Sequence, residues 1–153
     1  MAQGTGRRPG GLTALAVLNF VFAGLHALNV LGAVFIYAMA GSLKEKMTTA
    51  DDRAVFEAFE NMNVGLWALI LISTTLALVL LIVAGVGYLK MRKWGRLTGN
   101  LYAGISIIAG VLGAMITPSE LGGGFSIGTI IGLVYPVLTL YFLNLTFKDD
   151  LVS

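Results

Sequence analysis

Four long segments without Asp, Glu, Lys or Arg dominate the pattern of apolar and polar positions. They cover residues 9–43, 61–89, 97–119 and 121–147. Each is longer than the roughly 20 apolar residues with which a helix crosses a hydrocarbon core of about 30 Å. Backbone exposed to lipid must also form its hydrogen bonds internally, which favours helices. The pattern therefore predicts an all-α membrane four-helix bundle, a single domain over residues 1–153, with spans at about 12–40, 64–89, 97–117 and 125–147.

The basic residues between these spans are unevenly distributed. Seven of the ten fall on the side that carries both termini, and three fall on the other side. The seven are Arg7, Arg8, Lys90, Arg92, Lys93, Arg96 and Lys148, and the three are Lys44, Lys46 and Arg53. Cytoplasmic loops carry the excess of Lys and Arg. We therefore expect a multi-pass protein of a bacterial inner membrane with both termini in the cytoplasm.

The segment 41–63 forms the one long predicted loop, on the outer side. Val55, Phe56, Phe59 and Met62 recur there at helical spacing. This spacing predicts either a short surface helix or two to three extra turns at the start of the second span. The acidic residues of the loop are dispersed among helix-forming residues, so they indicate a solvated face rather than a metal or acid–base site.

Small residues form a stripe along the third predicted span. Successive spacings of three and four residues place them on one helix face. The stripe contains Gly99, Ala103, Ser106, Gly110, Gly113 and Thr117, and Gly128 and Gly132 form a shorter version in the fourth span. In lipid, such stripes let helices approach closely. We interpret them as internal seams of the bundle, with an interface between subunits as the alternative.

The amino-acid composition argues against several classes of function. The chain has no Cys and one His, and no Asp, Glu, Lys or Arg lies within a span. Intramembrane ionisable residues normally mark proton relays and ion pathways. No nucleophile–base pair or metal set can be assembled from the remaining residues, so we expect no enzyme and no resident cofactor.

The polar residues inside the spans are the remaining candidates for a site. They are Asn19, His26, Asn29, Ser73 and Asn100. Asn19 and His26 are seven residues apart and share a helix face. We expect a neutral His26 that hydrogen-bonds across helices to Asn100 or Ser73. The alternative is a tetrapyrrole ligand, because imidazole binds such metals.

The basic turn after the second span has two interpretations. Lys90, Arg92, Lys93 and Arg96 could bind anionic lipid headgroups or could act only as a topological signal. Four cations next to a membrane form too small a footprint for nucleic acid. Aromatic residues near the predicted span ends are expected to anchor at the interface, namely Trp67, Tyr88, Trp94 and Tyr141. Pro136 is expected to kink the fourth span.

Three segments resemble small bacterial four-span membrane proteins that begin with an Arg-Pro-x-Gly-x-Thr-x-Leu-Ala pattern. They are RRPGGLTALAVLNFVFAGL, GVGYLKMRKWGRLTGNLYAGISII and LVYPVLTLYFLNLTFKDD. The resemblance covers most of the chain outside the loop 41–63. It implies the same four-helix topology and brings no catalytic residues.

Together these features predict a non-enzymatic tetraspan protein that serves as a structural or accessory subunit of a homo-oligomer or larger membrane assembly, with membrane lipids as partners. A small channel or transporter for an uncharged solute is the first alternative. A tetrapyrrole-binding subunit that uses His26 is the second.

Overall fold

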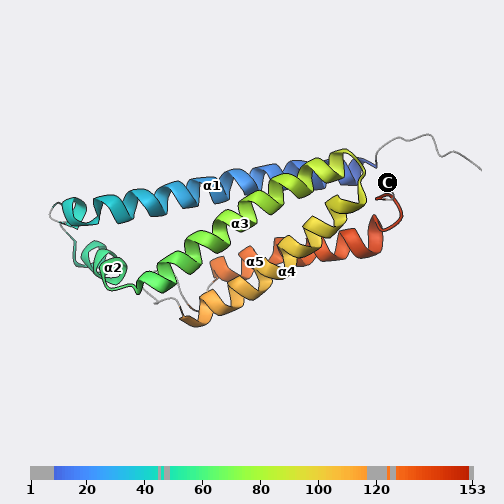
Figure 1. Ribbon diagram of the computed structural model, residues 1–153. Helices are drawn as coiled ribbons and strands as arrows, with labels where there is room; N and C mark the ends of the chain where they lie inside the picture. Colours follow the sequence, from blue (N-terminus) through green and yellow to red (C-terminus); the bar gives the residue numbers. More distant parts are fainter. Residues whose placement is uncertain (1–8, 45, 47–48, 117–123, 125–126, 152–153) are drawn as a thin grey trace, which may run out of the picture.

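The computed structural model describes residues 9–44, 46, 49–116, 124 and 127–151, and every element in this part of the chain is helical. In chain order they are α1 (Gly10–Lys44), α2 (Ala50–Glu60), α3 (Val64–Leu89), α4 (Lys93–Ile116), α5 (Ile127–Tyr141) and the π-helical segment η2 (Phe142–Thr146) (Figure 1). Four helical segments among these residues are long and apolar enough to cross a membrane, namely α1, α3, α4 and α5 with η2. The predicted all-helical chain with four apolar helices is confirmed.

The long helices pack in succession, α1 on α3, α3 on α4, and α4 on α5. The start of α1 and the C-terminal residues lie at the same end of the molecule (Figure 1). We call the end with the start of α1, the turn Lys90–Arg92 and η2 the terminal end. The opposite end, with α2, the end of α4 and the start of α5, is the loop end. Arg7, Arg8 and Thr117 lie outside the described residues.

Helix boundaries differ from the expected ones mainly at charged residues. The third apolar helix begins at Lys93 rather than near 97. Long basic side chains can lay their aliphatic stems along apolar surface while the charged groups reach water, so a membrane helix can begin within a basic cluster. The loop helix α2 is separate from α3, because Asn63 caps α3 and its side-chain oxygen accepts a hydrogen bond from the Gly65 N–H at 2.7 Å. The structure therefore contains a short helix rather than an extension of the second span.

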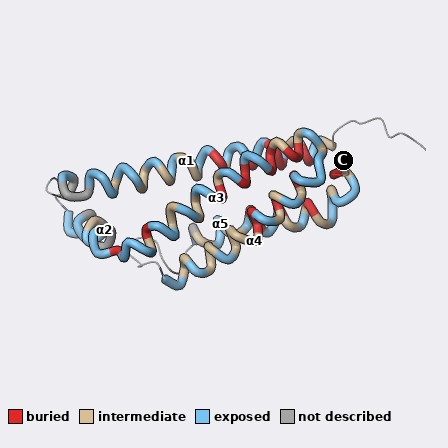
Figure 2. The backbone as a smooth tube through the Cα atoms, in the orientation of Figure 1, coloured by how far each residue is buried: buried red, intermediate tan, exposed pale blue. Residues whose placement is uncertain are grey.

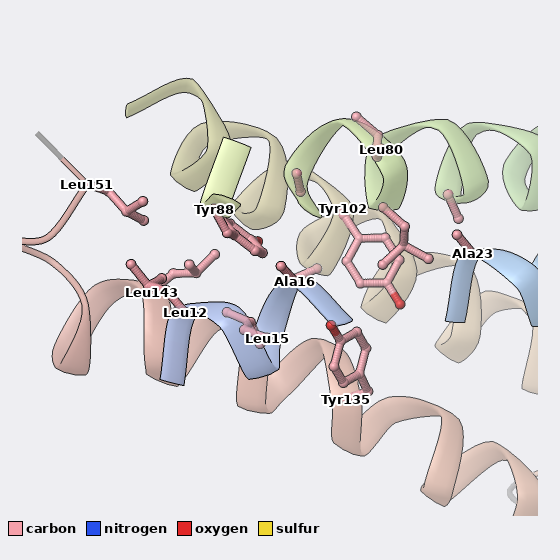
Figure 3. Packing of buried hydrophobic residues seen from close by; sticks show 14 residues of the cluster. Leu12, Leu15, Ala16, Ala23, Leu80, Tyr88, Tyr102, Tyr135, Leu143 and Leu151 are labelled. Carbon is pink, nitrogen blue, oxygen red and sulfur yellow. The ribbon is translucent and has the colours of Figure 1, made fainter. Parts of the chain in front are cut away.

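The hydrophobic core occupies the terminal half of the bundle. Buried residues concentrate there in Figure 2, and Figure 3 shows the cluster at close range. Its members come from α1, α3, α4, α5 and the C-terminal segment, and include Leu12, Leu15, Ala16, Leu81, Ala84, Tyr88, Tyr102, Ala103, Tyr135, Leu143 and Leu151. Towards the loop end the buried hydrophobic residues are few, with Met62 and Trp67 among them. The bundle is thus tightly packed at one end only.

The turn between α3 and α4 brings two helices into direct backbone contact. A Cβ atom on Gly95 would lie 2.8 Å from the Gly87 Cα and 2.7 Å from its carbonyl carbon. These distances leave no room for a side chain at either position. Within the turn, Met91 adopts a positive φ of 52°. The close approach of α3 and α4 therefore depends on glycine at both positions.

Two of the four predicted interfacial anchors, Tyr88 and Trp67, are buried instead. Tyr88 is fully buried in the core, although it is near the end of α3. Its hydroxyl occupies the space that a Cβ on Gly99 would need. The missing side chain of Gly99 lets the ring turn inward. Trp94 and Tyr141 are exposed near the terminal end, whereas Trp67 is buried and packs edge-on against Tyr37 with ring centroids 5.5 Å apart.

The end of the last helix departs from α geometry after Tyr141. In η2 the Phe147 N–H donates to the Phe142 carbonyl, five residues back, at 2.8 Å. The side chain of Asn144 donates to the Leu140 carbonyl at 2.8 Å. The wider turn thus places an asparagine side chain against the backbone. Pro136 lies fully buried within α5, six residues before η2 begins.

Candidate binding cavity

The small-residue stripe on α4 faces the inside of the bundle along its described length, but its two halves have different surroundings. Gly99 and Ala103, at the terminal end, are buried in the packed core. Ser106, Gly110 and Gly113, further along, line an open space. The same stripe therefore provides close packing in one half and free volume in the other.

This space is a cavity of about 410 Å³ between the four long helices. Its walls are mainly small and apolar, and its polar groups are uncharged. The hydroxyl groups belong to Ser73, Thr74, Tyr102, Ser106 and Thr129, and the glycines are Gly110, Gly113 and Gly132. Binding sites for small molecules are usually concave, largely apolar, and lined by a few placed polar groups. The cavity has the size and the lining of such a site.

His26 contributes the imidazole from α1 to this cavity. Its Nδ1 atom is buried and has no hydrogen-bond partner among the described residues. The predicted bond to Asn100 is not found, because the Asn100 amide bonds to Asn144 at the terminal end. The Ser73 hydroxyl donates to the Ile70 carbonyl at 3.0 Å instead. A buried nitrogen without a partner is costly, so a bound molecule that hydrogen-bonds to it would gain affinity.

The hydroxyl groups of the cavity have room to accept hydrogen bonds. Ser73 uses its hydrogen on the Ile70 carbonyl, and Thr129 donates to the Gly124 carbonyl at 3.0 Å. The Ser73 oxygen keeps acceptor capacity after its hydrogen is used. The cavity can therefore receive a ligand that carries hydrogen-bond donors.

A buried polar network lies on the terminal side of the cavity, at residues that do not line it. Asn19 is fully buried, and its amide nitrogen donates to the Leu81 carbonyl at 3.2 Å. The Tyr135 hydroxyl donates to the Asn19 side-chain oxygen. Phe22 stacks on the Tyr135 ring with centroids 4.1 Å apart. These contacts join α1, α3 and α5 at one level of the bundle.

The seam between α1 and α5 is formed by side chains rather than by close backbones. The pairs of helices in extensive backbone contact do not include α1 with α5. Tyr135 reaches across to Phe22 and Asn19, and Phe147 lies against Gly11. At the loop end, no comparable bridge is found among the described residues of these two helices.

A second polar group lies at the terminal end. The side-chain oxygen of Asn144 accepts hydrogen bonds from the Arg96 Nη2 at 3.0 Å and the Asn100 Nδ2 at 3.2 Å. The Asn144 amide nitrogen donates back to the Asn100 oxygen at 2.9 Å. The arrangement ties α4 to η2 and fixes the direction of the Arg96 side chain.

The other predicted polar residue of a span, Asn29, is exposed on α1. Gly132 lines the cavity. Gly128 lies in α5, but its burial is not among the described features. Sequence reasoning missed Tyr135 and Asn144 as hydrogen-bonding partners. Asn144 and Asn100 lie near the same ends of consecutive antiparallel spans, which is the signal that could have paired them.

The described residues form no group of three His, Asp or Glu side chains that could hold a metal ion. Comparison of the chain with protein-family models, with curated proteins and with solved structures finds no match. The cavity and its lining are therefore the features of the chain that bear on its function.

Proposed function

We propose that this multi-pass membrane protein binds a small, uncharged, partly apolar molecule in the loop-end cavity and acts as a carrier for it. The buried, unpartnered Nδ1 of His26 in the cavity wall is the observation that carries the proposal. A neutral imidazole nitrogen can accept a hydrogen bond from a hydroxyl or amide of the ligand.

The lining favours an uncharged ligand. The described lining residues include no Asp, Glu, Lys or Arg that could neutralise a charge. An unpaired charge in an apolar site costs several kcal/mol of desolvation. Small uncharged compounds with a hydroxyl or amide group suit this lining. They offer a hydrogen-bond donor to His26 and apolar surface to the remaining wall.

A carrier agrees better with the geometry than an open channel does. The terminal half is filled by side chains that are fully buried, such as Leu12, Leu81 and Tyr88. Passage through the bundle would require the terminal end to open. The α1–α5 seam, which is held by side chains and lacks extensive backbone contact, is the place where we expect the bundle to separate.

The test is the molecule retained by the purified protein. Full-length protein is extracted in mild detergent, and small molecules released on denaturation are identified by mass spectrometry. We expect one retained species, reduced at least about tenfold by Gly113→Leu, which fills the cavity. Gly104→Leu is the matched control, because Gly104 lies on the same helix, has open space around it and does not line the cavity.

His26→Leu should reduce retention as Gly113→Leu does, while His26→Gln, which keeps an acceptor, should reduce it less. Equal retention in wild type, Gly113→Leu and Gly104→Leu would reject the proposal. The absorbance spectrum of the same sample tests the tetrapyrrole alternative, in which His26 binds the metal. A visible band lost in His26→Leu would replace the uncharged ligand with a tetrapyrrole.

A structural or accessory subunit is the second candidate function, and exposed Asn29 favours it. Asn19 contacts Leu81 and Tyr37 contacts Trp67, so Asn29 lies beside the middle of α3. An amide facing lipid at that depth gains by bonding to another helix. If assembly depends on it, Asn29→Leu should yield a smaller particle in native mass spectrometry, whereas Asn29→Gln should keep the wild-type mass.

The proposed location is a bacterial inner membrane with both termini in the cytoplasm. The common position of the two ends of the described chain and the basic residues beside them support this orientation. Because the chain has no Cys, single cysteines can be introduced at Ser42 and at Ser153. In intact cells, a membrane-impermeant thiol reagent should label only the cysteine at 42.

A further inference from the structure

The terminal end carries a second cavity, of about 430 Å³, whose wall is basic. Lys93 and Arg96 come from the start of α4, and Lys148 comes from the segment after η2. One carboxylate, that of Asp149, lies in the same wall. Three cations and one anion leave an excess of positive charge, so the cavity is complementary to an anion.

Arg96 is held in position by a neutral partner. Both its Nε and its Nη2 donate to the side-chain oxygen of Asn144, at 3.4 and 3.0 Å. Asn144 is fixed in turn by Asn100 and by the Leu140 carbonyl. Because Asn144 is neutral, these hydrogen bonds leave the positive charge of the guanidinium uncompensated. They also do not use the N–H groups on Nη1, which can bind another acceptor. A phosphate matches such a fork of donors.

The cavity also borders the apolar outer surface. Leu97 is in its wall and is 70% exposed, and Leu101, one turn further, is 51% exposed. Trp94, beside Lys93, is 38% exposed, as befits the boundary between water and hydrocarbon. A ligand in this place can put a phosphate against the cations and an acyl chain along the leucines.

We infer that this cavity is a specific site for one anionic phospholipid. Arg96 binds the phosphodiester, Lys93 and Lys148 neutralise the headgroup, and Leu97 contacts the chain. Lys90 and Arg92 belong to the same basic turn but do not line the cavity. The site therefore differs from a diffuse attraction of the whole turn to an anionic surface, to which every exposed cation contributes.

The experiment measures lipid binding to the full-length protein by native mass spectrometry, with phosphatidylglycerol and phosphatidylcholine titrated separately. We expect one tightly bound phosphatidylglycerol, with affinity reduced at least about tenfold by Arg96→Gln and about fivefold by Lys148→Gln. Arg92→Gln is the matched control, since it removes the same charge from the same turn and should change the affinity less than about twofold.

Arg96→Lys should recover only part of the binding, because it restores charge without the fork. If Arg96→Gln does not fold, the phosphatidylglycerol affinities of Lys148→Gln and Arg92→Gln are compared instead, and a larger loss in Lys148→Gln supports the specific site. Equal losses in Arg92→Gln and in the cavity variants would overturn the site in favour of diffuse attraction. Displacement of the lipid by inorganic phosphate at equal concentration would overturn the lipid as the ligand and assign free phosphate.

Discussion

The two ends of the bundle use the same kinds of residues in opposite ways. At the terminal end, glycines bring backbones together, as at Gly87 and Gly95. At the loop end, Gly113 and Gly132 face open space, with no atom within 4 Å of an added Cβ. Apolar lipid provides little hydrophobic force between helices, so packing supplies their association. One half of the bundle is therefore closely packed, and the other half encloses the open space in which we propose that a ligand binds.

Polar groups follow the same division with one exception, the Tyr88 hydroxyl, which is buried at the terminal end and has no hydrogen-bond partner among the described residues. At the terminal end the side chains of Asn19 and Asn144 have hydrogen-bond partners on other helices. At the loop end the buried Nδ1 of His26 has none among the described residues. A satisfied polar group stabilises the fold, whereas an unsatisfied one costs stability unless a ligand pairs with it. Of the two unpartnered groups, only His26 lines the cavity, which is why we propose it, and not Tyr88, as a ligand-binding residue.

The largest expected effect is a loss of packing at the terminal end. Gly95→Ala should lower the free energy of unfolding by ~3 kcal/mol, because the new methyl group meets the Gly87 backbone. Chemical denaturation in detergent micelles measures it. Gly113→Ala is the control and should change stability by less than ~1 kcal/mol, since alanine favours helix and nothing obstructs it. Similar losses at both positions would contradict the contrast between the two ends.

The next effect concerns the buried network. Asn19→Leu should cost ~2 kcal/mol, because it leaves the Tyr135 hydroxyl buried without its acceptor. Tyr135→Phe should cost less, since the Leu81 carbonyl keeps its bond to Asn19. The double variant should lose less than the sum of the single variants. Additive losses in this cycle would show that the two side chains are energetically independent.

Replacing His26 should change the free energy of unfolding in the opposite direction. In ligand-free protein, His26→Leu should raise the free energy of unfolding by ~1 kcal/mol, because it removes a buried nitrogen without a partner. The same denaturation assay measures the change. A loss as large as that of Asn19→Leu would mean that His26 is a structural residue, and the functional role of the loop end would fail with it.

The smallest effect is expected at the turn between α3 and α4. Met91 has a positive φ, which is costly for a residue with a side chain and free for glycine. Met91→Gly should therefore stabilise the protein by ~0.5 kcal/mol. Leu89→Gly, at the helical end of α3, serves as the control and should destabilise it. Destabilisation by both changes would show that Met91 contributes contacts that outweigh its strain.

The apolar helices could be predicted from sequence because charged residues fall only between them or in their terminal turns. The stripe on α4 was also visible, as it depends on spacing alone. The inward position of Tyr88 was not, because it requires knowing that Gly99 lies opposite. The cavity could not be predicted either, since it depends on how far the helices diverge towards the loop end. The sequence also suggested a hydrogen bond between His26 and Asn100, because both are polar residues within spans. The structure places them at different levels of the bundle, His26 in the loop-end cavity and Asn100 at the terminal end.

The turn at Lys90–Arg92 also bears on how the chain enters the membrane. Because Gly87 and Gly95 touch directly beside this turn, α3 and α4 can pair as soon as both have been synthesised. Such a hairpin buries its seam without α5. It can insert as one unit and keep Lys90, Arg92 and Lys93 on the side from which it came. We expect α5, which follows in the chain, to pack on this hairpin last.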